Sequence, residues 1–394
     1  MLQPAGGAGV TRFLASVRDA DEAAIALAGG ADVIDFKDPA AGALGAVAPG
    51  IVREGAALVA GARPVSAVLG DLPMHAALLR DAAETMAATG VDYLKLGIFP
   101  GGDAEAALAA LAPLAARVKL VAVFFADRNP DLSLLALLAE HRFAGAMLDT
   151  AGKNGARLLD HMDIARLGRF VAECRRLGLL SGLAGGLELP DIPRLLLLAP
   201  DLLGFRTALC GAQGRASAIE AESVAMVRAL IPGLGTGAAP GGVDFRLLAA
   251  RGYAPEQESD PALTDRVHLR DFVLPMKIGV YAHERARPQN VRFAVTVVIA
   301  RPRRLVADLR DVFSYDVISD TIRMLADAGH VGLVETLAER IAARLLAHPP
   351  VLKVEIRVEK LETGTGIVGI TIERTREAAV VTLPYLVGAS GAEA

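Results

Sequence analysis

The chain has 394 residues, of which 53 % are hydrophobic and 22 % are charged, so it can bury a sizeable core and is not a disordered protein. At roughly 100–200 residues per domain, this length predicts two domains. A net charge of −4, with 4 % aromatic residues and no tryptophan, argues against a nucleic-acid partner, because such proteins usually carry a basic face and stack bases on aromatic rings.

The first part of the chain alternates short apolar runs with longer segments whose apolar residues recur at i, i+3 and i+4, such as Asp19–Ala28, Ala104–Ala116 and Met162–Leu177. The runs predict eight strands: Arg12–Val17, Asp32–Phe36, Pro64–Leu69, Asp92–Lys95, Lys119–Phe124, Gly145–Leu148, Leu179–Leu183 and Leu203–Phe205. Eight β-α units in about 230 residues predict an α/β fold, a (β/α)₈ TIM barrel over residues 1–232. An open doubly wound sheet is the alternative, but the Gly-rich fingerprint that often follows its first strand is absent from the sequence.

A Gly/Pro-rich segment, PGLGTGAAPGG from Pro232 to Gly242, ends this pattern, and the polar stretch Pro255–Asp265 follows it. Such composition is typical of a connecting segment. We therefore place a linker at residues 233–264.

The next part of the chain predicts a β-β-α-α-β-β order. The expected elements are the strands Arg266–Leu274, Arg292–Ala300, Leu352–Lys360 and Ile367–Arg374 and the helices Asp316–Ala328 and Val334–Ala347. This order indicates a smaller α+β domain over residues 265–377, followed by a tail at 378–394. Because four strands are too few to close a barrel, we expect a homo-oligomer that covers the sheet edges through this domain.

The chain shows no signal for export or for membrane insertion. Its first residues lack a basic segment followed by an apolar one, and no run of about 18 uncharged apolar residues occurs. Two cysteines, Cys174 and Cys210, cannot build a disulfide framework. We therefore expect a cytoplasmic protein with no membrane partner.

Lysine is scarce, since only seven of the 41 basic residues are lysines. Lys37 and Lys95 end predicted barrel strands, and Lys153 lies in the loop after Asp149, which follows another strand. The carboxyl ends of barrel strands surround the active site. Clustered ammonium groups lower one another's pKa and free an amine to attack a carbonyl, and Asp149 could carry protons. The alternative is that these lysines only bind a phosphorylated substrate; Lys119, at the opposite rim, is expected to be structural.

Glycines follow the seventh predicted strand. Gly185 and Gly186 lie there, and Arg206 and Thr207 end the eighth strand in the segment GFRT. Loops after strands 7 and 8 commonly hold a phosphate, because glycine lets backbone amides approach its oxygens, and arginine can add a bidentate contact. The alternative is that the two glycines only form a turn.

The segments that carry these residues resemble a known family. The segments GGADVIDFKDPAAGALGA, VLGDLP, DYLKLGIF, MLDTAGKNG, LAGGLELPDIP and GFRTALC, within residues 11–231, are similar to (5-formylfuran-3-yl)methyl phosphate synthase of methanofuran biosynthesis. The resemblance implies a (β/α)₈ barrel that condenses two glyceraldehyde 3-phosphates through a lysine imine, with loss of water and one phosphate. It implies that Lys37 forms the imine and that Lys95, Asp149 and Lys153 are further active-site residues.

Four residues of the second domain could act on a heterocycle: Glu284, Tyr315, Glu335 and Lys360. A buried carboxylate can pair bidentately with the N–H/NH₂ edge of a pterin or guanine, and a lysine beside a tyrosine can pass a proton. Taken alone, Glu335 could instead be an exposed charge of an amphipathic helix, and Tyr315 a half-buried core residue.

Together these motifs, within residues 265–375, resemble dihydroneopterin aldolase, most specifically in the segment VETLAERIA. The resemblance implies a tunnelling fold, ring-shaped tetramers or octamers, a site between subunits, and neither a metal nor an imine. It implies that Glu335 anchors 7,8-dihydroneopterin, that Lys360 is the general base assisted by Tyr315, and that Glu284 is a further active-site carboxylate.

Both resemblances favour a bifunctional lyase without cofactor or metal. Its substrates would be glyceraldehyde 3-phosphate and 7,8-dihydroneopterin, precursors for two carriers of one-carbon units. One alternative is an imine-forming aldolase on another phosphorylated aldehyde, with a second domain that only assembles the oligomer; retention of all four second-domain residues argues against it. A fusion with dihydropteroate synthase is less favoured, since the motifs of that barrel are absent from the sequence.

Overall fold

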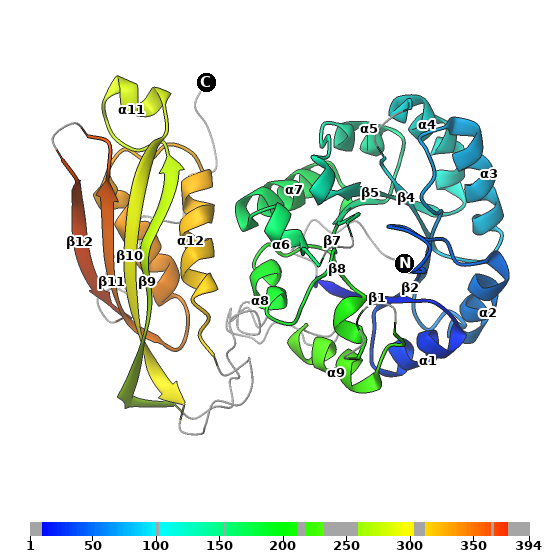
Figure 1. The fold of residues 1–394 in the computed structure, drawn as a ribbon, viewed down its shortest axis with the longest axis horizontal. Coiled ribbons are helices and arrows are strands. Elements are labelled where there is room, and N and C mark those ends of the chain that lie inside the picture. The colour runs from blue at the N-terminus through cyan, green and yellow to red at the C-terminus, as the bar shows by residue number, and fades with distance from the viewer. Residues whose placement is uncertain are drawn as a thin grey trace. The chain divides into compact units, whose positions relative to one another are not determined.

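The computed structural model describes residues 10–99, 102–152, 155–211, 214, 217–231, 259–302, 312–363 and 366–376. The chain divides into two compact units, Met1–Arg246 and Leu247–Ala394, and each is described by itself (Figure 1). Most of the predicted linker and the whole predicted tail lie outside the described residues, so their boundaries remain predictions.

The first unit is a closed barrel of eight parallel strands in sequence order, and β8 pairs with β1 through Arg12 and Leu202. Its strands are β1 (Arg12–Val17), β2 (Val33–Phe36), β3 (Val65–Val68), β4 (Tyr93–Gly97), β5 (Lys119–Phe125), β6 (Gly145–Asp149), β7 (Leu180–Leu183) and β8 (Leu202–Phe205). This confirms the predicted (β/α)₈ barrel.

Helices surround the barrel (Figure 1). The described helices are α1 (Ala20–Ala28), α2 (Pro49–Val59), α3 (Ala76–Ala87), α4 (Ala104–Leu111), α5 (Leu134–Glu140), α6 (Leu158–His161), α7 (Ile164–Arg176), α8 (Asp191–Leu196) and α9 (Ala221–Leu230), with 3₁₀ turns η1 (Ala112–Ala116), η2 (Ala126–Arg128) and η3 (Thr207–Leu209). The predicted helix Ala104–Ala116 divides into α4 and η1 because Pro113, at the start of η1, has no N–H to continue the α-helical ladder.

Strand alternation decides which side chains enter the barrel. Leu14, Val33 and Leu202 form one interior cluster. Since side chains two residues apart share a face, Asp35 of β2 must point inward like Val33. The same rule directs Lys37, directly after β2, toward the barrel interior, and this arrangement brings charged groups to the carboxyl ends of the strands.

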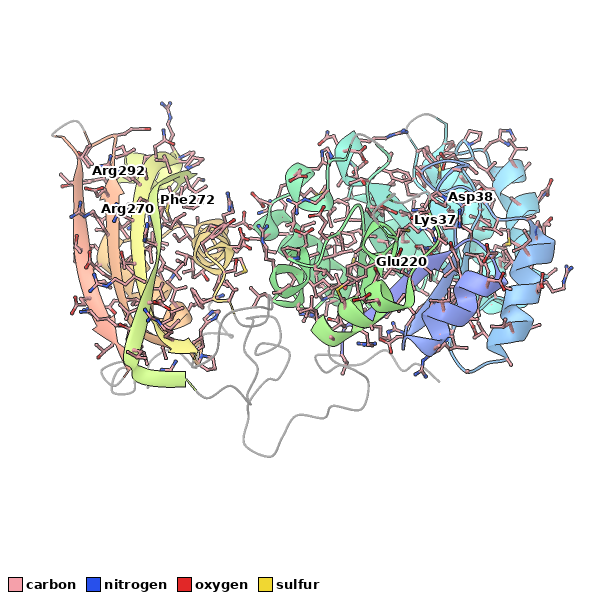
Figure 2. The ribbon with its side chains drawn as sticks, turned by 60° about the horizontal axis from the view of Figure 1, so that its bottom comes forward. Lys37, Asp38, Glu220, Arg270, Phe272 and Arg292 are labelled. Carbon is pink, nitrogen blue, oxygen red and sulfur yellow. The ribbon has the colours of Figure 1, made fainter. Side chains whose placement is uncertain are left out.

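The second unit is an antiparallel sheet in the order β12-β11-β10-β9. Its elements are β9 (Ser259–Met276), α11 (Ala282–Ala286), β10 (Gln289–Pro302), α12 (Asp316–Asp327), α13 (Val334–Leu346), β11 (Val351–Lys360) and β12 (Val368–Thr375). Alternate β10 residues, from Val291 to Val297, are buried in one core with Ile318, Ile322 and Ile341 of the two long helices. The predicted α+β order is therefore confirmed; Arg270, Phe272 and Arg292 mark the sheet in Figure 2.

Strand β9 differs from its prediction in two ways. It begins at Ser259 rather than Arg266, because Asp260 and Ser259 pair with the end of β10 and backbone pairing overrides the polar composition of the segment. Within the strand, the register shifts near Asp271, whose φ is 52°. This bulge changes the alternation, so that Leu269 and Phe272 both pack against the core. None of the helices within the described ranges is long and apolar enough to cross a bilayer.

Candidate active site

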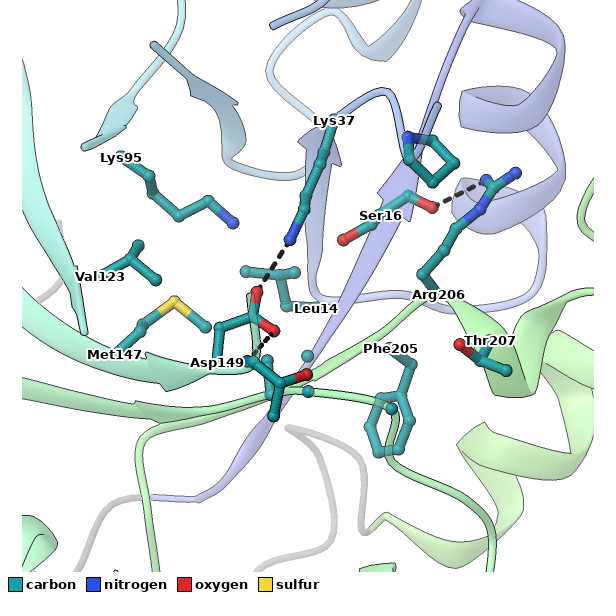
Figure 3. A pocket seen from close by; sticks show the side chains of 16 residues that line it. Leu14, Ser16, Lys37, Lys95, Val123, Met147, Asp149, Phe205, Arg206 and Thr207 are labelled. Atoms are coloured by element: carbon teal, nitrogen blue, oxygen red, sulfur yellow. Dashed lines mark hydrogen bonds and ion pairs between the residues drawn. The ribbon is translucent and has the colours of Figure 1, made fainter. Parts of the chain in front are cut away.

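A pocket that is partly open to solvent lies at the carboxyl ends of the barrel strands. Leu14, Val123 and Met147 give it an apolar floor, and charged side chains enter from several strands (Figure 3). The pocket is lined by Leu14, Ser16, Lys37, Pro39, Lys95, Val123, Met147, Asp149, Thr150, Ala184, Gly185, Gly186, Gly204, Phe205, Arg206 and Thr207. Residues from both ends of the barrel sequence thus meet at one site.

Lys37 and Asp149 form an ion pair across the pocket. Nζ of Lys37 lies 2.8 Å from Oδ2 of Asp149, and each side chain keeps 12 % exposure. Oδ1 of Asp149 accepts a hydrogen bond from the Thr150 N–H at 2.7 Å, which fixes the carboxylate plane. The Lys37 amine can therefore meet a small molecule in the pocket while an oriented proton acceptor stands beside it.

A second pair, Lys95 and Asp35, lies deeper. Nζ of Lys95 is 2.6 Å from Oδ2 of Asp35, with side chains 6 % and 0 % exposed. Oδ2 also accepts a hydrogen bond from Ser16 Oγ at 3.1 Å. Burial lowers the pKa of Lys95 most strongly, the nearby Lys37 lowers it further, and Asp35 opposes both effects.

Asp35 is not among the residues predicted from the sequence. It carries a usable signal, since it lies two residues before Lys37 and therefore on the same face of the strand. The sequence could not show that Asp35 and Lys95 form a pair, because they are 60 residues apart in the chain and lie on different strands, β2 and β4.

Gly185 and Gly186, which follow β7, both have positive φ angles, a backbone conformation that side chains rarely allow. Gly185 has φ +111°, and a Cβ there would lie 2.9 Å from the Thr150 nitrogen. Gly186 has φ +60°, in the left-handed region that favours glycine. Both line the pocket, as does Thr207 at the start of η3. Their assignment to phosphate binding stays a prediction.

Arg206 lines the pocket, but its guanidinium is paired with a carboxylate. Its two terminal nitrogens donate to Oε2 and Oε1 of Glu22 at 2.5 and 3.2 Å, and others of its bonds reach the carbonyls of Ser16 and Ser217. Glu22, only 3 % exposed, was not identified from the sequence. In this state the predicted bidentate contact of Arg206 is made to Glu22 (Figure 3 shows the bond to Ser16).

The loop after β6 is held by a carboxylate of the 3₁₀ turn η2, which follows β5. Asp127 accepts the N–H groups of Ala151 and Gly152 at 2.9 and 2.7 Å. Lys153, the next residue of the prediction, lies outside the described residues. Lys119 begins β5 at the opposite rim, with Nζ 4.9 Å from the Tyr93 ring centre, and its structural role stays a prediction.

In the second unit, Glu284 and Lys360 come together. Lys360, the last residue of β11, donates to Oε1 of Glu284, which Gln289 also approaches at 3.3 Å. The Tyr281 N–H donates to Oε2. The hydrogen bond from Lys360, ahead of the backbone bond from Tyr281, lowers the pKa of Glu284 to about 2. Gln289, missed in the sequence, completes the cluster.

Among the described residues, neither Tyr315 nor Glu335 forms a hydrogen bond or an ion pair with Glu284 or Lys360. Tyr315, before α12, is 64 % exposed, and Glu335 is exposed in the first turn of α13. Their predicted roles remain untested. Across the described ranges, no group of three or more His, Cys, Asp or Glu residues could hold a metal ion.

Comparison with known proteins assigns the two units separately. The family model of 4-HFC-P synthase matches residues 13–228, and that of dihydroneopterin aldolase matches residues 267–373. The latter match agrees with the predicted tunnelling fold of the second domain.

Individual relatives give the same picture. A Methylorubrum extorquens protein provisionally named (5-formylfuran-3-yl)methyl phosphate synthase is 47 % identical over 214 residues, covering 54 % of this chain and 89 % of the relative. The (5-formylfuran-3-yl)methyl phosphate synthase of Methanosarcina mazei is 35 % identical over 225 residues, or 54 % and 96 % of the two chains. A crystal structure of E. coli dihydroneopterin aldolase in complex with neopterin is 30 % identical, with a TM-score of 0.26, over 28 % of this chain and 98 % of that one.

Proposed function

The chain belongs to the 4-HFC-P synthase family and carries a dihydroneopterin aldolase domain, and from this premise we propose that it is a bifunctional lyase. Its barrel condenses two glyceraldehyde 3-phosphates to (5-formylfuran-3-yl)methyl phosphate, a methanofuran precursor. Its second domain cleaves 7,8-dihydroneopterin. The observation that carries the barrel proposal is the Lys37–Asp149 pair in an open pocket, 2.8 Å between Nζ and Oδ2.

The first step is imine formation at Lys37. Nζ must lose a proton before it can attack, and Asp149 Oδ2 is close enough to take it. The neutral amine adds to the aldehyde carbon of the first substrate, and the carbinolamine loses water to give the imine. Removal of a proton from the adjacent carbon then gives an enamine, whose carbon forms the new C–C bond with the second aldehyde.

Lys95 and Asp35 are assigned to proton transfer beneath Lys37. Burial lowers the pKa of Lys95, so its amine gives up a proton more readily than an exposed lysine does, as an acid–base group must. Asp35 accepts the hydrogen bond of the Lys95 amine and a second one from Ser16, which fixes the carboxylate. Lys153 is proposed as a further active-site cation.

The product side of the reaction balances without an added reactant. Two glyceraldehyde 3-phosphates contain the atoms of one furan phosphate, one inorganic phosphate and two waters. After the C–C bond has formed, attack of a hydroxyl on a carbonyl closes the ring, and loss of water and phosphate makes it aromatic, so no oxidant or reductant is needed. Gly185, Gly186 and Thr207 are assigned to a substrate phosphate, since glycine backbone can approach oxygens closely. Arg206, paired with Glu22, supports this wall of the pocket.

The second domain is proposed to release glycolaldehyde from 7,8-dihydroneopterin, leaving 6-hydroxymethyl-7,8-dihydropterin. Lys360 takes the proton of the side-chain hydroxyl as the C–C bond breaks, and Glu284 orients it. Glu335 anchors the pterin, and Tyr315 assists the proton transfer. Because Tyr315 and Glu335 are exposed in the single chain, we propose that a second copy completes the site within a homo-oligomer.

Two assays on the full chain test both halves. Incubation with glyceraldehyde 3-phosphate should release furan aldehyde and phosphate in equal amounts, and incubation with 7,8-dihydroneopterin should release glycolaldehyde. Lys37→Arg should abolish the first activity and spare the second, whereas Lys360→Ala should do the reverse, so each variant controls the other. Absence of furan product from the wild-type chain would reject the barrel proposal. Absence of glycolaldehyde would favour a second domain that only assembles the oligomer.

A further inference from the structure

The loop that follows Lys37 is tied to a carboxylate outside the pocket. Asp71, in the loop after β3, accepts the N–H of Ala43 through Oδ2 at 2.8 Å and that of Leu44 through Oδ1 at 2.6 Å. Both carboxylate oxygens are thus used on two consecutive amides. Asp71 is exposed and does not line the pocket, so it has no evident contact with substrate.

The backbone beside Asp71 is built for this contact. Gly42 has φ +145°, and a Cβ at that position would lie 2.4 Å from Oδ2 of Asp71. A side chain there would both strain the backbone and push the carboxylate away. The next residues are anchored as well, since Ala43 is 6 % and Leu44 0 % exposed, in a cluster with Val123 and Met147 of the pocket floor.

The same loop closes directly behind Lys37. The Asp38 N–H donates to the Gly45 carbonyl at 2.8 Å, so the residue after Lys37 is bonded to the residue after Leu44. Pro39, between them, lines the pocket. A shift of Ala43 and Leu44 therefore reaches the Lys37 backbone through the neighbouring Gly45 and its hydrogen bond with Asp38.

We propose that Asp71 is a positioning residue that holds the Lys37 loop over the barrel, so that the Lys37 amine stays in line with Asp149 and the substrate carbonyl. The inference rests on the proposed function of Lys37. We call the two hydrogen bonds from the Ala43 and Leu44 amides to Asp71 the clamp. Loss of the clamp should slow adduct formation at Lys37, although no group that contacts substrate is removed. Misplacement of a reacting group by about 1 Å can lower a rate by about 100-fold.

The test uses Asp71→Asn in the full chain, which keeps the size of the side chain but places an NH₂ against one of the two N–H donors. The matched control is Asp92→Asn, because Asp92 is also exposed and accepts one backbone N–H, that of Val65 at 2.8 Å, at the opposite rim of the barrel. Two quantities are measured: amide hydrogen exchange of Ala43 and Leu44 without substrate, and the rate of borohydride-trapped Lys37 adduct with glyceraldehyde 3-phosphate.

Asp71→Asn should speed exchange at Ala43 and Leu44 and slow trapping by about 10- to 100-fold. Asp92→Asn should leave both quantities near wild type. Gly42→Ala, which displaces the carboxylate without altering it, should repeat the Asp71→Asn result and serves if that variant folds poorly.

If Asp71→Asn forms the trapped Lys37 adduct at the wild-type rate, the inference is overturned, whether amide exchange at Ala43 and Leu44 is faster or unchanged. If the wild-type chain forms no adduct, the proposed function of Lys37 fails instead. Amide exchange at Ala43 and Leu44 is measured without substrate, so it still shows whether Asp71 holds the loop.

Discussion

Lys95 and Asp35 form a buried ion pair inside the barrel, 2.6 Å between Nζ and Oδ2. Asp35 is 0 % exposed, and its other oxygen, Oδ1, has no hydrogen-bond partner among the described residues. A buried charge left without its partner is strongly destabilising, whereas replacement of both charges by apolar groups of similar size is often tolerated. Loss of stability should therefore depend on whether one charge or both are removed, whereas loss of catalysis should follow in either case.

Removal of one partner should destabilise the barrel more than removal of both. Lys95→Met leaves the Asp35 carboxylate alone and should lower the free energy of unfolding by about 3–5 kcal/mol, while Lys95→Met combined with Asp35→Leu should recover most of that loss. Both variants should lack furan formation. Urea denaturation measures the first effect, and equal destabilisation of the single and double variants would contradict the interaction.

The stability contribution of Glu284 should depend on pH. Its pKa falls from 4.5 to about 2 in the folded chain, so the folded state favours the ionised carboxylate. Its contribution is fully present above about pH 5 and is lost as pH falls toward about 2. The difference in unfolding free energy between wild type and Glu284→Gln should therefore shrink over this interval. A difference that stays constant down to about pH 3 would show that Lys360 does not stabilise the charge.

Glu335 and Lys360 should affect different steps of the pterin reaction. Glu335→Gln places an NH₂ against a pterin donor and should weaken 7,8-dihydroneopterin binding at least about tenfold, or roughly 1.4 kcal/mol. Lys360→Ala should lower kcat for glycolaldehyde release while binding changes little, since a general base acts in the transition state. Calorimetry and an aldehyde assay separate the two. Unchanged binding in Glu335→Gln would leave that residue as a surface charge of α13.

The strand pattern was predictable because each barrel strand is short, apolar and bounded by polar segments, and β1 was predicted with its observed bounds, Arg12–Val17. Lys37 and Asp149 could be placed at the strand ends from position alone. Lys95 was predicted to end its strand, but it is the third of the five residues of β4, which continues to Gly97. The partners of these charges could not be predicted, because they meet only once the barrel has closed. Asp35 on β2 reaches Lys95 on β4 across the interior with β3 between them, and Glu22 on α1 meets Arg206 after β8. The early start of β9 was missed since backbone pairing, not side-chain hydrophobicity, extends that strand.

Assembly should depend on the second domain. The sheet ends in β9 and β12, each paired on one side among the described strands, so a second copy can cover them. A shortened chain of residues 1–235 should have fewer subunits per particle than the full chain. Light scattering measures this, and equal stoichiometry would place the main interface on the barrel.

Borohydride trapping tests the imine at Lys37 most directly. The full chain is reduced in the presence of glyceraldehyde 3-phosphate, digested, and mapped by mass spectrometry, with Lys37→Arg treated in parallel. A stable adduct is expected on the peptide that contains Lys37 and none in the variant, because arginine keeps the charge but cannot form the imine. An adduct on Lys95 or Lys153 in both proteins, or no adduct in a wild-type chain that still makes the furan, would contradict it.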